Sequence, residues 1–280
     1  MSTSIDQAFI KQYEKEVHTA YQRRGAKLRN TVRTISNVVG SSAVFQKVGK
    51  GTAATKTRHG LVPVMNLVHN NEEVILQDYY AGDWVDKLDL LKTNIDERNV
   101  ITTAGAAALG RKTDELIIDA LDEVSASGQI ILDGNTGMTK AKAMQAMEIA
   151  GSHDIFEEGE MWAVVGWKQW GELLGVDEFS NADYVGSDNL PFKASMGTQP
   201  KFWLGAYWLP HSGLPVSNDI RKCYFYHKNS VGHASGSEVQ TDITWHGDRA
   251  AHFVNNMMSQ GAGLIDELGV VEIQCDETPD

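Results

Sequence analysis

The sequence predicts an α+β fold, and three observations carry this prediction. Apolar residues recur at helical spacing over residues 94–124, which indicates one helix of about 28 residues where about 11 to 12 is usual. Two segments of strand character, 42–48 and 61–76, enclose a basic stretch almost without large apolar side chains and predict a long hairpin. Beyond residue 128, strand-like and helix-like segments alternate, which is typical of an α/β subdomain.

Composition excludes several classes of protein. The 280 residues are 42% hydrophobic and 22% charged, an ordinary globular balance with enough chain to bury a sizeable core. The formal net charge of −12 disfavours general nucleic-acid binding. Cys223 and Cys275 are too few for a disulfide framework, which fits a reducing compartment. There is no signal-peptide pattern and no apolar run of ~20 residues, so we expect a soluble, cytoplasmically made protein with no membrane partner.

The N-terminal region carries an amphipathic pattern and a basic cluster. Phe9, Tyr13, Val17 and Tyr21 follow one another at intervals of four, which predicts a helix over residues 5–28. Its apolar face could pack on its own domain or lie, as an arm, on a neighbouring subunit. The basic cluster departs from the acidic balance of the chain and consists of Arg23, Arg24, Lys27, Arg29 and Arg33.

The predicted hairpin has a basic tip, residues 47–60, that is rich in glycine and threonine. The run from Gly49 to Thr52 could suggest a phosphate-binding loop, but it lacks the full spacing of that motif and a preceding buried strand. Such a hairpin cannot bury itself on its own domain, and an exposed one is an aggregation liability, so we expect a partner for it. Its cations are Lys47, Lys50, Lys56 and Arg58.

The long helix has a start signal and an acidic second half. Thr93 or Asn94 can cap its first turn, where Asp96 and Glu97 complement the helix dipole. Residues 125–128 end it. Its apolar stripe is narrow and partly alanine, so a neighbour must pack closely along it. The acidic residues of the second half are Asp114, Glu115, Asp119, Asp122 and Glu123.

The remaining elements follow in order. A second helix is expected over residues 138–150, capped by Thr136 or Thr139. A buried strand over 161–166 leads directly into a short helix over 167–174. The later segments are strands at 201–210 and 221–227, a turn and strand within 245–258, and a glycine bend with a strand pair over 261–273.

No pattern for catalysis or metal binding stands out. The pairs His227/His233 and His246/His252 are each six residues apart, which is not the spacing of helical metal ligands. Cys223 lies in a strand-like run, which indicates a buried, inert thiol. Nucleophile-elbow and dinucleotide-binding motifs are missing, and adjacent acids on a helix diverge by ~100° instead of forming an acid–base couple. We predict no catalytic residues, no metal site and no cofactor.

Several stretches, and the order of the elements, carry a resemblance to a known family. Residues 161–166, 169–174 and 179–186 resemble the start of an axial domain, and residues 261–265 and 269–273 resemble the closing strands of a peripheral domain. Arm, basic hairpin, long helix, mixed subdomain and terminal strands follow the order of a tailed-bacteriophage major capsid protein. That family has the Hong Kong 97-type fold, which herpesvirus capsids and encapsulins share. The resemblance spans nearly the whole chain, and the order carries more weight than any one stretch.

The resemblance implies a domain plan and a function. It places an N-terminal arm at residues 1–40, an extended loop at 41–76, a peripheral domain at 77–127 and 238–280, and an axial domain at 128–237. The long helix would be the spine of the peripheral domain, and the loop would reach over that domain of the next subunit. The implied function is a non-enzymatic shell protein whose hexamers and pentamers close into an icosahedral capsid around double-stranded DNA. It would be assembled in the host bacterial cytoplasm and found in the virion.

The resemblance also implies partners. Larger members of the family carry an N-terminal scaffolding segment that a protease removes. The hairpin here begins soon after residue 40, so we expect no such segment and a separate scaffolding protein instead. A portal is a further expected partner, and whether a decoration protein is used stays open. The basic N-terminal cluster would contact packaged DNA through its phosphates, or it is a solvated helix face.

Some shells of this type are crosslinked by a lysine–asparagine bond between the loop and a neighbour. Here the loop offers Lys47, Lys50 and Lys56, and a late strand offers Asn255 and Asn256. Adjacent residues of a strand point to opposite faces, so at most one of the two asparagines could be well placed for such a bond.

Charge alone gives one more prediction. The basic residues of the loop and the acidic residues of the long helix are expected to meet between subunits, with charge setting the register and apolar area giving most of the affinity. Two other functions stay open. One is an encapsulin-like compartment shell around a protein cargo. The other is a soluble α/β enzyme that uses the polar loop 177–197 as a lid, because long loops often serve function.

Overall fold

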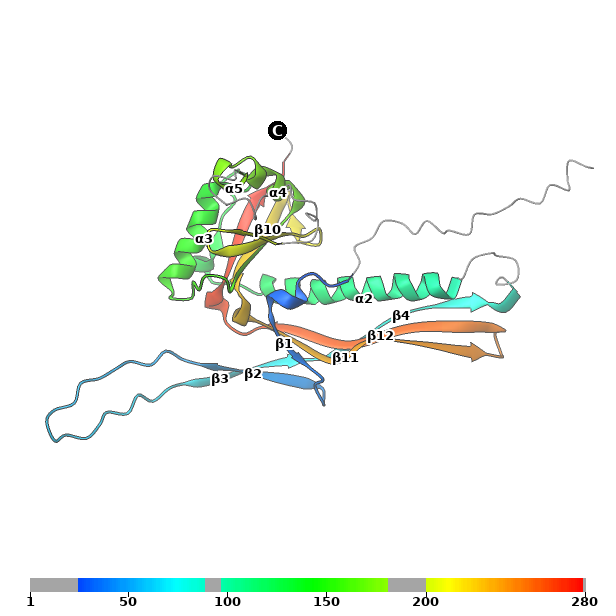
Figure 1. The fold of residues 1–280 in the computed structure, drawn as a ribbon, viewed down its shortest axis with the longest axis horizontal. Helices are drawn as coiled ribbons and strands as arrows, with labels where there is room; N and C mark the ends of the chain where they lie inside the picture. Colours follow the sequence, from blue (N-terminus) through cyan, green and yellow to red (C-terminus); the bar gives the residue numbers. More distant parts are fainter. Residues whose placement is uncertain (1–24, 89–96, 181–199, 279–280) are drawn as a thin grey trace, which may run out of the picture. The chain divides into compact units, whose positions relative to one another are not determined.

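The computed structural model describes residues 25–88, 97–180 and 200–278, as helices and strands that divide into two compact units (Figure 1). Of the described residues, the first unit comprises 25, 78–88, 97–111 and 238–258, and the second comprises 26–77, 112–180, 200–237 and 259–278. The chain passes from one unit to the other within α2 (Glu97–Asp122), β11 (Val231–His246) and β12 (Ala251–Leu264). No helix among the described residues is long and apolar enough to cross a bilayer.

A seven-stranded mixed sheet forms the centre of the second unit. Its strand order is β5-β13-β10-β6-β8-β7, with the short β9 beside β10. β10 pairs antiparallel with both β13 and β6, which makes it the central strand, and Tyr224, Phe225 and Tyr226 are fully buried in it. The strands are β5 (Ile130–Ile131), β6 (Met161–Val165), β7 (Lys201–Trp203), β8 (Ala206–Pro210), β9 (Val216–Ser217), β10 (Ile220–His227) and β13 (Val270–Asp276).

Helices cover this sheet because each presents a small or apolar face to it. α3 (Lys140–Ser152) packs against β13 and buries Ala143, Ala146 and Ala150, so helix and strand approach closely. Thr139 caps α3 by accepting a hydrogen bond from the Lys142 N–H, one of the two caps expected. α4 (Trp167–Leu174) and the short α5 (Asp177–Ser180) follow β6 (Figure 1). The expected strand 161–166 and helix 167–174 are confirmed.

The expected single strand over 201–210 is wrong, because the structure has two strands there. Leu204 and Gly205 both have positive φ, at 50° and 72°, and they form the tight turn between β7 and β8. A Cβ on Gly205 would lie 2.5 Å from the ring of Phe156, so both the backbone conformation and the packing require glycine. The turn lets Trp203 and Trp208 pack together, with ring centroids 5.4 Å apart.

Lys142 is buried in this unit, and its ammonium group contacts four backbone carbonyls. Its Nζ lies 2.7 to 3.0 Å from the backbone carbonyls of Asp133, Thr136, Gly137 and Gln274, which share its three N–H donors, and the residue is 7% exposed. One ammonium therefore holds the turn before α3 to β13.

Lys142→Met is expected to lower the free energy of unfolding by about 3 kcal/mol, because it keeps the apolar stem and leaves buried carbonyl oxygens unpaired. Lys140→Met, two residues away on the same helix, removes a surface ion pair with Glu178 and should cost less than about 1 kcal/mol. Chemical denaturation of both variants measures the difference. Equal losses would contradict the structural role of Lys142.

Lys201 is a buried lysine among aromatic rings. Its Nζ lies 3.7 Å from the centroid of the Phe179 ring, and it has no hydrogen-bond partner among the described residues. Burial lowers the pKa of Lys201 from 10.5 to about 8. Between these values the unfolded chain keeps a proton that the folded chain has released, so stability increases as the pH rises through this window.

Lys201→Met is expected to remove that increase. In the unmodified protein we expect the free energy of unfolding to increase between pH 8 and pH 10, because of the lowered pKa of Lys201. Denaturant titrations at several pH values measure both slopes. Parallel slopes in the variant and the unmodified protein would show that Lys201 is not the titrating group.

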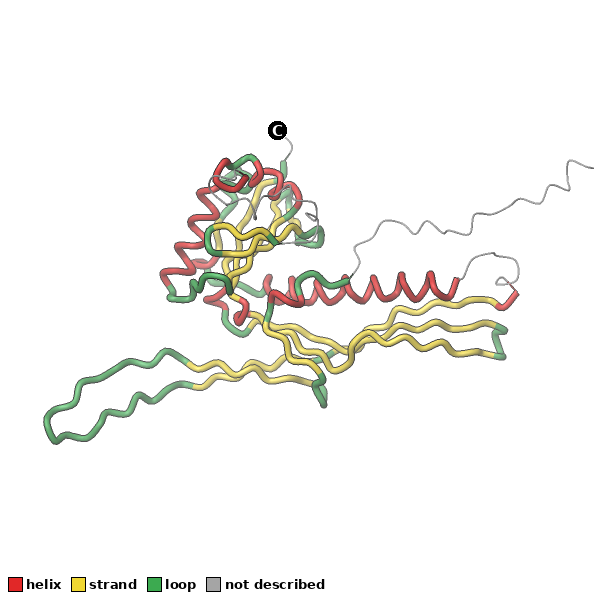
Figure 2. The backbone as a smooth tube through the Cα atoms, viewed as in Figure 1, coloured by secondary structure: helices red, strands yellow, loops and turns green. Residues whose placement is uncertain are grey.

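The expected hairpin is present, but its paired part is shorter than expected. β2 (Ser42–Val48) and β3 (His69–Ile75) pair antiparallel, with Ser42 opposite Ile75 and Val48 opposite His69. Residues 49–68 extend beyond the two strands as a long loop, drawn green in Figure 2. The expected strand character of residues 61–68 is wrong, because Pro63 has no N–H and Asn66 adopts a positive φ of 40°.

The base of the hairpin has its own small core. Ala43, Phe45 and Val74 are buried against Ala234 of β11 and Ile265 after β12. β1 (Arg33–Ser36) pairs in parallel with residues 232–235 of β11 beside this cluster. The hairpin is therefore fixed at its base, while its tip has no core.

The first unit combines the first half of α2 with β4 (Gln77–Asp86) and the adjoining parts of β11 and β12. Asn256 is fully buried there: its Nδ2 donates to Ala81 O at 3.1 Å, and its Oδ1 accepts from Thr241 Oγ1 at 2.6 Å. A Cβ on Gly105 would lie 2.1 Å from Asn256 Nδ2, so glycine lets α2 approach the strand. This is the close neighbour that the alanine-rich stripe predicts.

Several expectations concern residues that the structure does not describe, among them most of the polar loop 177–197. The N-terminal helix over residues 5–28 falls largely within residues 1–24. The caps of the long helix, Thr93 and Asn94, fall within residues 89–96. From Glu97 onward the long helix is confirmed, and it ends at Asp122.

Candidate functional site

The extended loop, residues 49–68, is the most unusual surface of the second unit. Its return arm exposes a run of apolar side chains, with Leu61 96%, Val62 74% and Val64 80% exposed, and Met65 and Val68 more than half exposed. Contiguous exposed apolar residues mark interaction sites in soluble proteins. The loop is therefore a candidate for burial against another chain.

The four cations of the loop divide into two pairs. Lys47 forms an ion pair with Asp266 at 2.7 Å, and Lys50 binds the Asp154 carboxylate at 3.0 Å and the His153 carbonyl at 2.7 Å, all within the chain. Lys56 and Arg58 are exposed and have no ion pair among the described residues. They are the cations of the loop that remain available for a partner.

Asp114 is not on the surface where an inter-subunit contact would need it. It is fully buried, and its carboxylate accepts the backbone N–H groups of Lys27 and Leu28 at 2.9 Å and contacts His211 Nε2 at 3.2 Å. Gly213 N–H donates to His211 Nδ1, so Nε2 carries the proton that faces Asp114. Asp114 joins three segments of its own unit, which removes it from the predicted contact set.

The other acids of α2 differ in their exposure. Glu115, Asp119 and Glu123 are exposed and spaced four residues apart, so they form one acidic face on the helix surface. Partial burial and the neighbouring carboxylates of Glu115 and Asp122 raise the pKa of Asp119. Asp122 is partly buried and accepts from Lys222 Nζ at 2.5 Å and Tyr224 OH at 2.8 Å. The acidic face exposed to a partner is thus Glu115, Asp119 and Glu123, of which Glu115 already forms an ion pair with Lys112 at 2.8 Å.

The basic N-terminal cluster is only partly described. Arg23 and Arg24 lie outside the described residues. Lys27 anchors its backbone N–H on Asp114, Arg29 begins a short 3-10 helix, and the Arg33 guanidinium lies 5.6 Å from the centre of the Phe45 ring. The part of this cluster that the structure describes thus has local contacts within the second unit.

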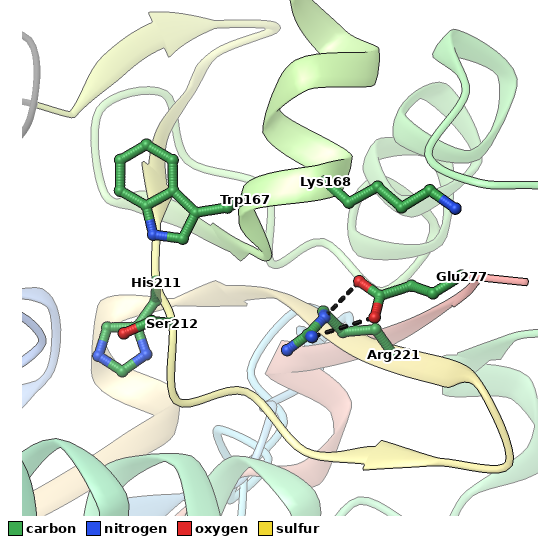
Figure 3. Close-up of a pocket in the computed structure, with 6 residues that line it drawn as sticks. All are labelled: Trp167, Lys168, His211, Ser212, Arg221 and Glu277. Carbon is green, nitrogen blue, oxygen red and sulfur yellow. Dashed lines mark hydrogen bonds and ion pairs between the residues drawn. The ribbon is translucent and has the colours of Figure 1, made fainter. Parts of the chain in front are cut away.

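A cavity of about 290 Å³ lies at the start of α4, lined by Trp167, Lys168, His211, Ser212, Arg221 and Glu277 (Figure 3). Arg221 binds the Glu277 carboxylate at two points, at 2.5 and 3.0 Å, and this contact lowers the pKa of Glu277. Gln169 Nε2 also donates to Glu277, at 3.0 Å. Arg221, Glu277 and His211 thus already hold partners within the chain, so the cavity presents no nucleophile activated by a base.

The histidines and cysteines make no metal site within residues 25–88, 97–180 and 200–278, where no three potential ligands gather. His227 lies 3.6 Å from Glu157, and His233 lies 3.2 Å from Gln260. Cys223 and Cys275 are both buried, as expected for Cys223, and burial raises the pKa of the Cys223 thiol. A protonated, buried thiol is a poor nucleophile.

The two asparagines considered for crosslinking point to opposite faces of β12, as their adjacency predicts. Asn256 is buried with both ends of its amide hydrogen-bonded, which removes it from the reach of a lysine on another chain. Asn255 is half-buried. Of the three loop lysines, Lys47 and Lys50 are engaged in ion pairs within the chain, so only Lys56 and Asn255 remain as a conceivable pair.

Comparison with known proteins gives a consistent result. The sequence model of the phage capsid protein family matches residues 5–277. Among solved structures, the cyanophage Pam1 capsid asymmetric unit is 16% identical with a TM-score of 0.76 and covers 100% of this chain and 99% of its own. A Mycobacterium phage Che8 chain is 15% identical, with a TM-score of 0.72 and coverage of 95% and 97%. The Ralstonia phage GP4 capsid is 11% identical, with a TM-score of 0.73 and coverage of 97% and 96%. No curated protein matches.

Proposed function

This chain belongs to the phage capsid protein family, and from that premise we propose that its copies close into the icosahedral head of a tailed bacteriophage around double-stranded DNA. The protein is a structural component of the virion capsid, it has the Hong Kong 97-type fold, and it is not an enzyme. The predicted resemblance is therefore confirmed, and the alternative of a soluble α/β enzyme is set aside.

The extended loop is the observation that carries self-assembly. Its apolar arm and its two unpaired cations, Lys56 and Arg58, have no counterpart within the described part of the chain. The Pam1 structure is described as a capsid asymmetric unit, and that of phage PhiM1 as the asymmetric unit of a mature capsid. A second copy of this chain is the partner that both features favour.

We propose the acidic face of α2 as the surface that receives the cations of the loop. Glu115, Asp119 and Glu123 present negative charge to solvent, and Lys56 and Arg58 present positive charge on an apolar loop. Complementary charge would set the register between subunits, while burial of the apolar arm would supply most of the affinity. The proposed contact between loop and helix is therefore the one expected from charge, limited to the residues that are exposed.

The domain plan belongs to the same proposal. Residues 77–127 and 238–280 would form the peripheral domain, and residues 128–237 the axial domain that packs around five- and six-fold centres in pentamers and hexamers. A separate scaffolding protein, a portal and a decoration protein would complete the particle. Arg29 and Arg33 would contribute non-specific contacts to the phosphates of the packaged DNA. Because the chain has a net charge of −12, such contacts would be confined to this basic cluster.

Protected nucleic acid distinguishes a phage head from an encapsulin-like shell, which would share the fold and enclose a protein. Particles are purified from producing cells and treated with nuclease, and their contents are then extracted. We expect double-stranded DNA that resists nuclease until the shell is opened. Particles that contain a stoichiometric protein cargo and no protected DNA would establish the encapsulin-like alternative instead.

A further inference from the structure

An open sheet edge in the first unit has no partner strand in the described part of the chain. β11 continues to His246, but its pairing with β1 involves only residues 232–235. Beyond them, β11 is the outermost strand of its sheet, and β12 lies between β11 and β4. Residues 239–245 are all exposed, with Val239 39%, Ile243 46% and Trp245 45% exposed. An open edge rich in β-branched residues is a template for pairing with another chain.

The backbone directions along this edge follow from contacts within the first unit. A Cβ on Gly82 of β4 would lie 3.1 Å from the backbone O of Val254, so the Val254 carbonyl faces β4, and even-numbered residues of β12 direct their peptide groups to β4. Thr241 is bonded to the side chain of Asn256 across the strand pair, and even-numbered Asn256 faces β4. In an antiparallel pair, two opposite residues either bond their peptide groups to each other or both turn them away from each other. Because the peptide groups of Asn256 turn toward β4, those of Thr241 turn toward the open edge of β11. The same holds for Val239, Ile243 and Trp245.

The opposite edge of this sheet is protected. On β4 the outward N–H of Trp84 is capped, because the Asp83 side chain accepts it at 2.7 Å. β4 carries three carboxylates, Asp78, Asp83 and Asp86, whereas residues 239–245 of β11 carry one, Asp242, and charged residues discourage strand pairing. No side chain among the described residues caps a backbone group of residues 239–245. The β11 edge is therefore the one that invites another strand.

We infer that residues 239–243 of β11 pair antiparallel with the same residues of a second copy, about a two-fold axis at Thr241. Thr241 then lies opposite Thr241 of the second copy, and Val239 lies opposite Ile243, so β-branched residues pair across the strands. On the other face Gln240 lies opposite Asp242, so no like charges lie directly opposite, and the two Asp242 carboxylates are diagonal neighbours. A two-fold axis at Asp242 would place the two Asp242 carboxylates opposite each other. It would also require even-numbered residues to pair, and their peptide groups face β12 instead of the open edge.

This pairing is self-complementary, as a two-fold contact requires, and joins two sheets into one. The three residue pairs, 239 with 243, 241 with 241, and 243 with 239, would exchange about six backbone hydrogen bonds. The inference rests on the proposed function only in requiring that copies of the chain meet. It adds a second contact, separate from the loop and the acidic face of α2.

Cysteine crosslinking tests the register with a single substitution. In Thr241→Cys the two thiols would sit in a hydrogen-bonded pair with Cα atoms about 5.5 Å apart, within disulfide range. In the matched control, Asp242→Cys, the two cysteines would lie diagonally at about 7–8 Å, which is too far for a disulfide. Cys223 and Cys275 are buried, so the unmodified chain gives the background.

The expected result is that assembled Thr241→Cys particles, oxidised with copper–phenanthroline, yield dimers that disappear on reduction, whereas Asp242→Cys particles stay monomeric on the gel. Monomers from assembled Thr241→Cys particles, or equal dimer yields from both variants, would overturn the pairing. Particles that form without the crosslink leave the proposed function intact. Failure of the unmodified chain to form particles counts against the proposed function itself.

Hydrogen exchange decides the matter without any substitution, and it applies even if the cysteine variants fail to assemble. The outward amides of Val239, Thr241 and Ile243 should exchange more slowly in the assembled particle than in the unassembled subunit. The capped amide of Trp84 on β4 serves as the internal comparison. Equal exchange of residues 239–243 in the two states would overturn the inference.

Discussion

Replacing Lys56 and Arg58 with glutamate is expected to abolish particle assembly while the subunit stays folded. Both cations are exposed at the tip of the extended loop and have no ion pair among the described residues, so the fold does not depend on them. Opposite the acidic face of α2, two glutamates would replace attraction with like-charge repulsion, which costs several kcal/mol at each interface. Because a shell repeats the contact in every copy, the loss of closed particles should be complete.

Charge-preserving and charge-swapped variants make this test specific. Lys56→Arg with Arg58→Lys keeps both charges and should assemble normally. Asp119→Lys with Glu123→Lys, added to the double glutamate variant, should restore assembly if the loop tip meets the acidic face. Circular dichroism and sedimentation velocity separate unfolded from unassembled protein. Normal particles from the double glutamate variant would refute the contact, and failed rescue would move the partner surface away from α2.

Asp114→Ala is expected to lower the free energy of unfolding by about 3–5 kcal/mol, the range for breaking a buried charged network. The carboxylate is fully buried and holds the backbone of Lys27 and Leu28 as well as His211. Its removal leaves two buried N–H groups and an imidazole N–H without their acceptor. The start of the described chain should then detach, which limited proteolysis near residue 25 would detect.

Glu115→Ala is the matched control for Asp114→Ala, because it removes the adjacent carboxylate on the same helix. Glu115 is exposed and, within the described part of the chain, forms only an ion pair with Lys112, so its loss should cost less than about 0.5 kcal/mol. Measuring both in the non-assembling double glutamate background keeps the subunit monomeric and the unfolding free of concentration effects. Similar losses in the two variants would contradict the anchoring role of Asp114.

Local sequence patterns predict much of the fold, because helix periodicity, capping and strand ends depend on residues that are close together in the sequence. The helical stripe of α2, the strand–helix junction at Gly166 and the threonine cap of α3 are all visible in short windows of sequence. The division of residues 201–210 into β7 and β8 cannot be predicted in this way, because it depends on Leu204 adopting a positive φ beside an apolar run. Residues 61–68 have strand composition, but Pro63 and Asn66 keep them from pairing.

The candidate site is predicted less completely, since exposure depends on distant segments. Asp114 and Glu115 are adjacent acids in one helix, and no local pattern separates them. Asp114 is buried because residues 27–28 and His211 close over it. The hydrogen bond from Lys142 Nζ to the Gln274 carbonyl also joins residues that are far apart in the sequence. The open edge of β11 has no sequence signal beyond β-branched residues without lysine or proline.

The size of the purified full-length protein tests self-assembly most directly. Size-exclusion chromatography with negative-stain microscopy, over a range of protein concentrations and with the double glutamate variant beside it, measures this size. We predict closed particles or capsomers in the megadalton range from the unmodified chain, and subunits from the variant. A discrete 30.8 kDa monomer at every concentration, with hydrolase activity, would contradict the shell function.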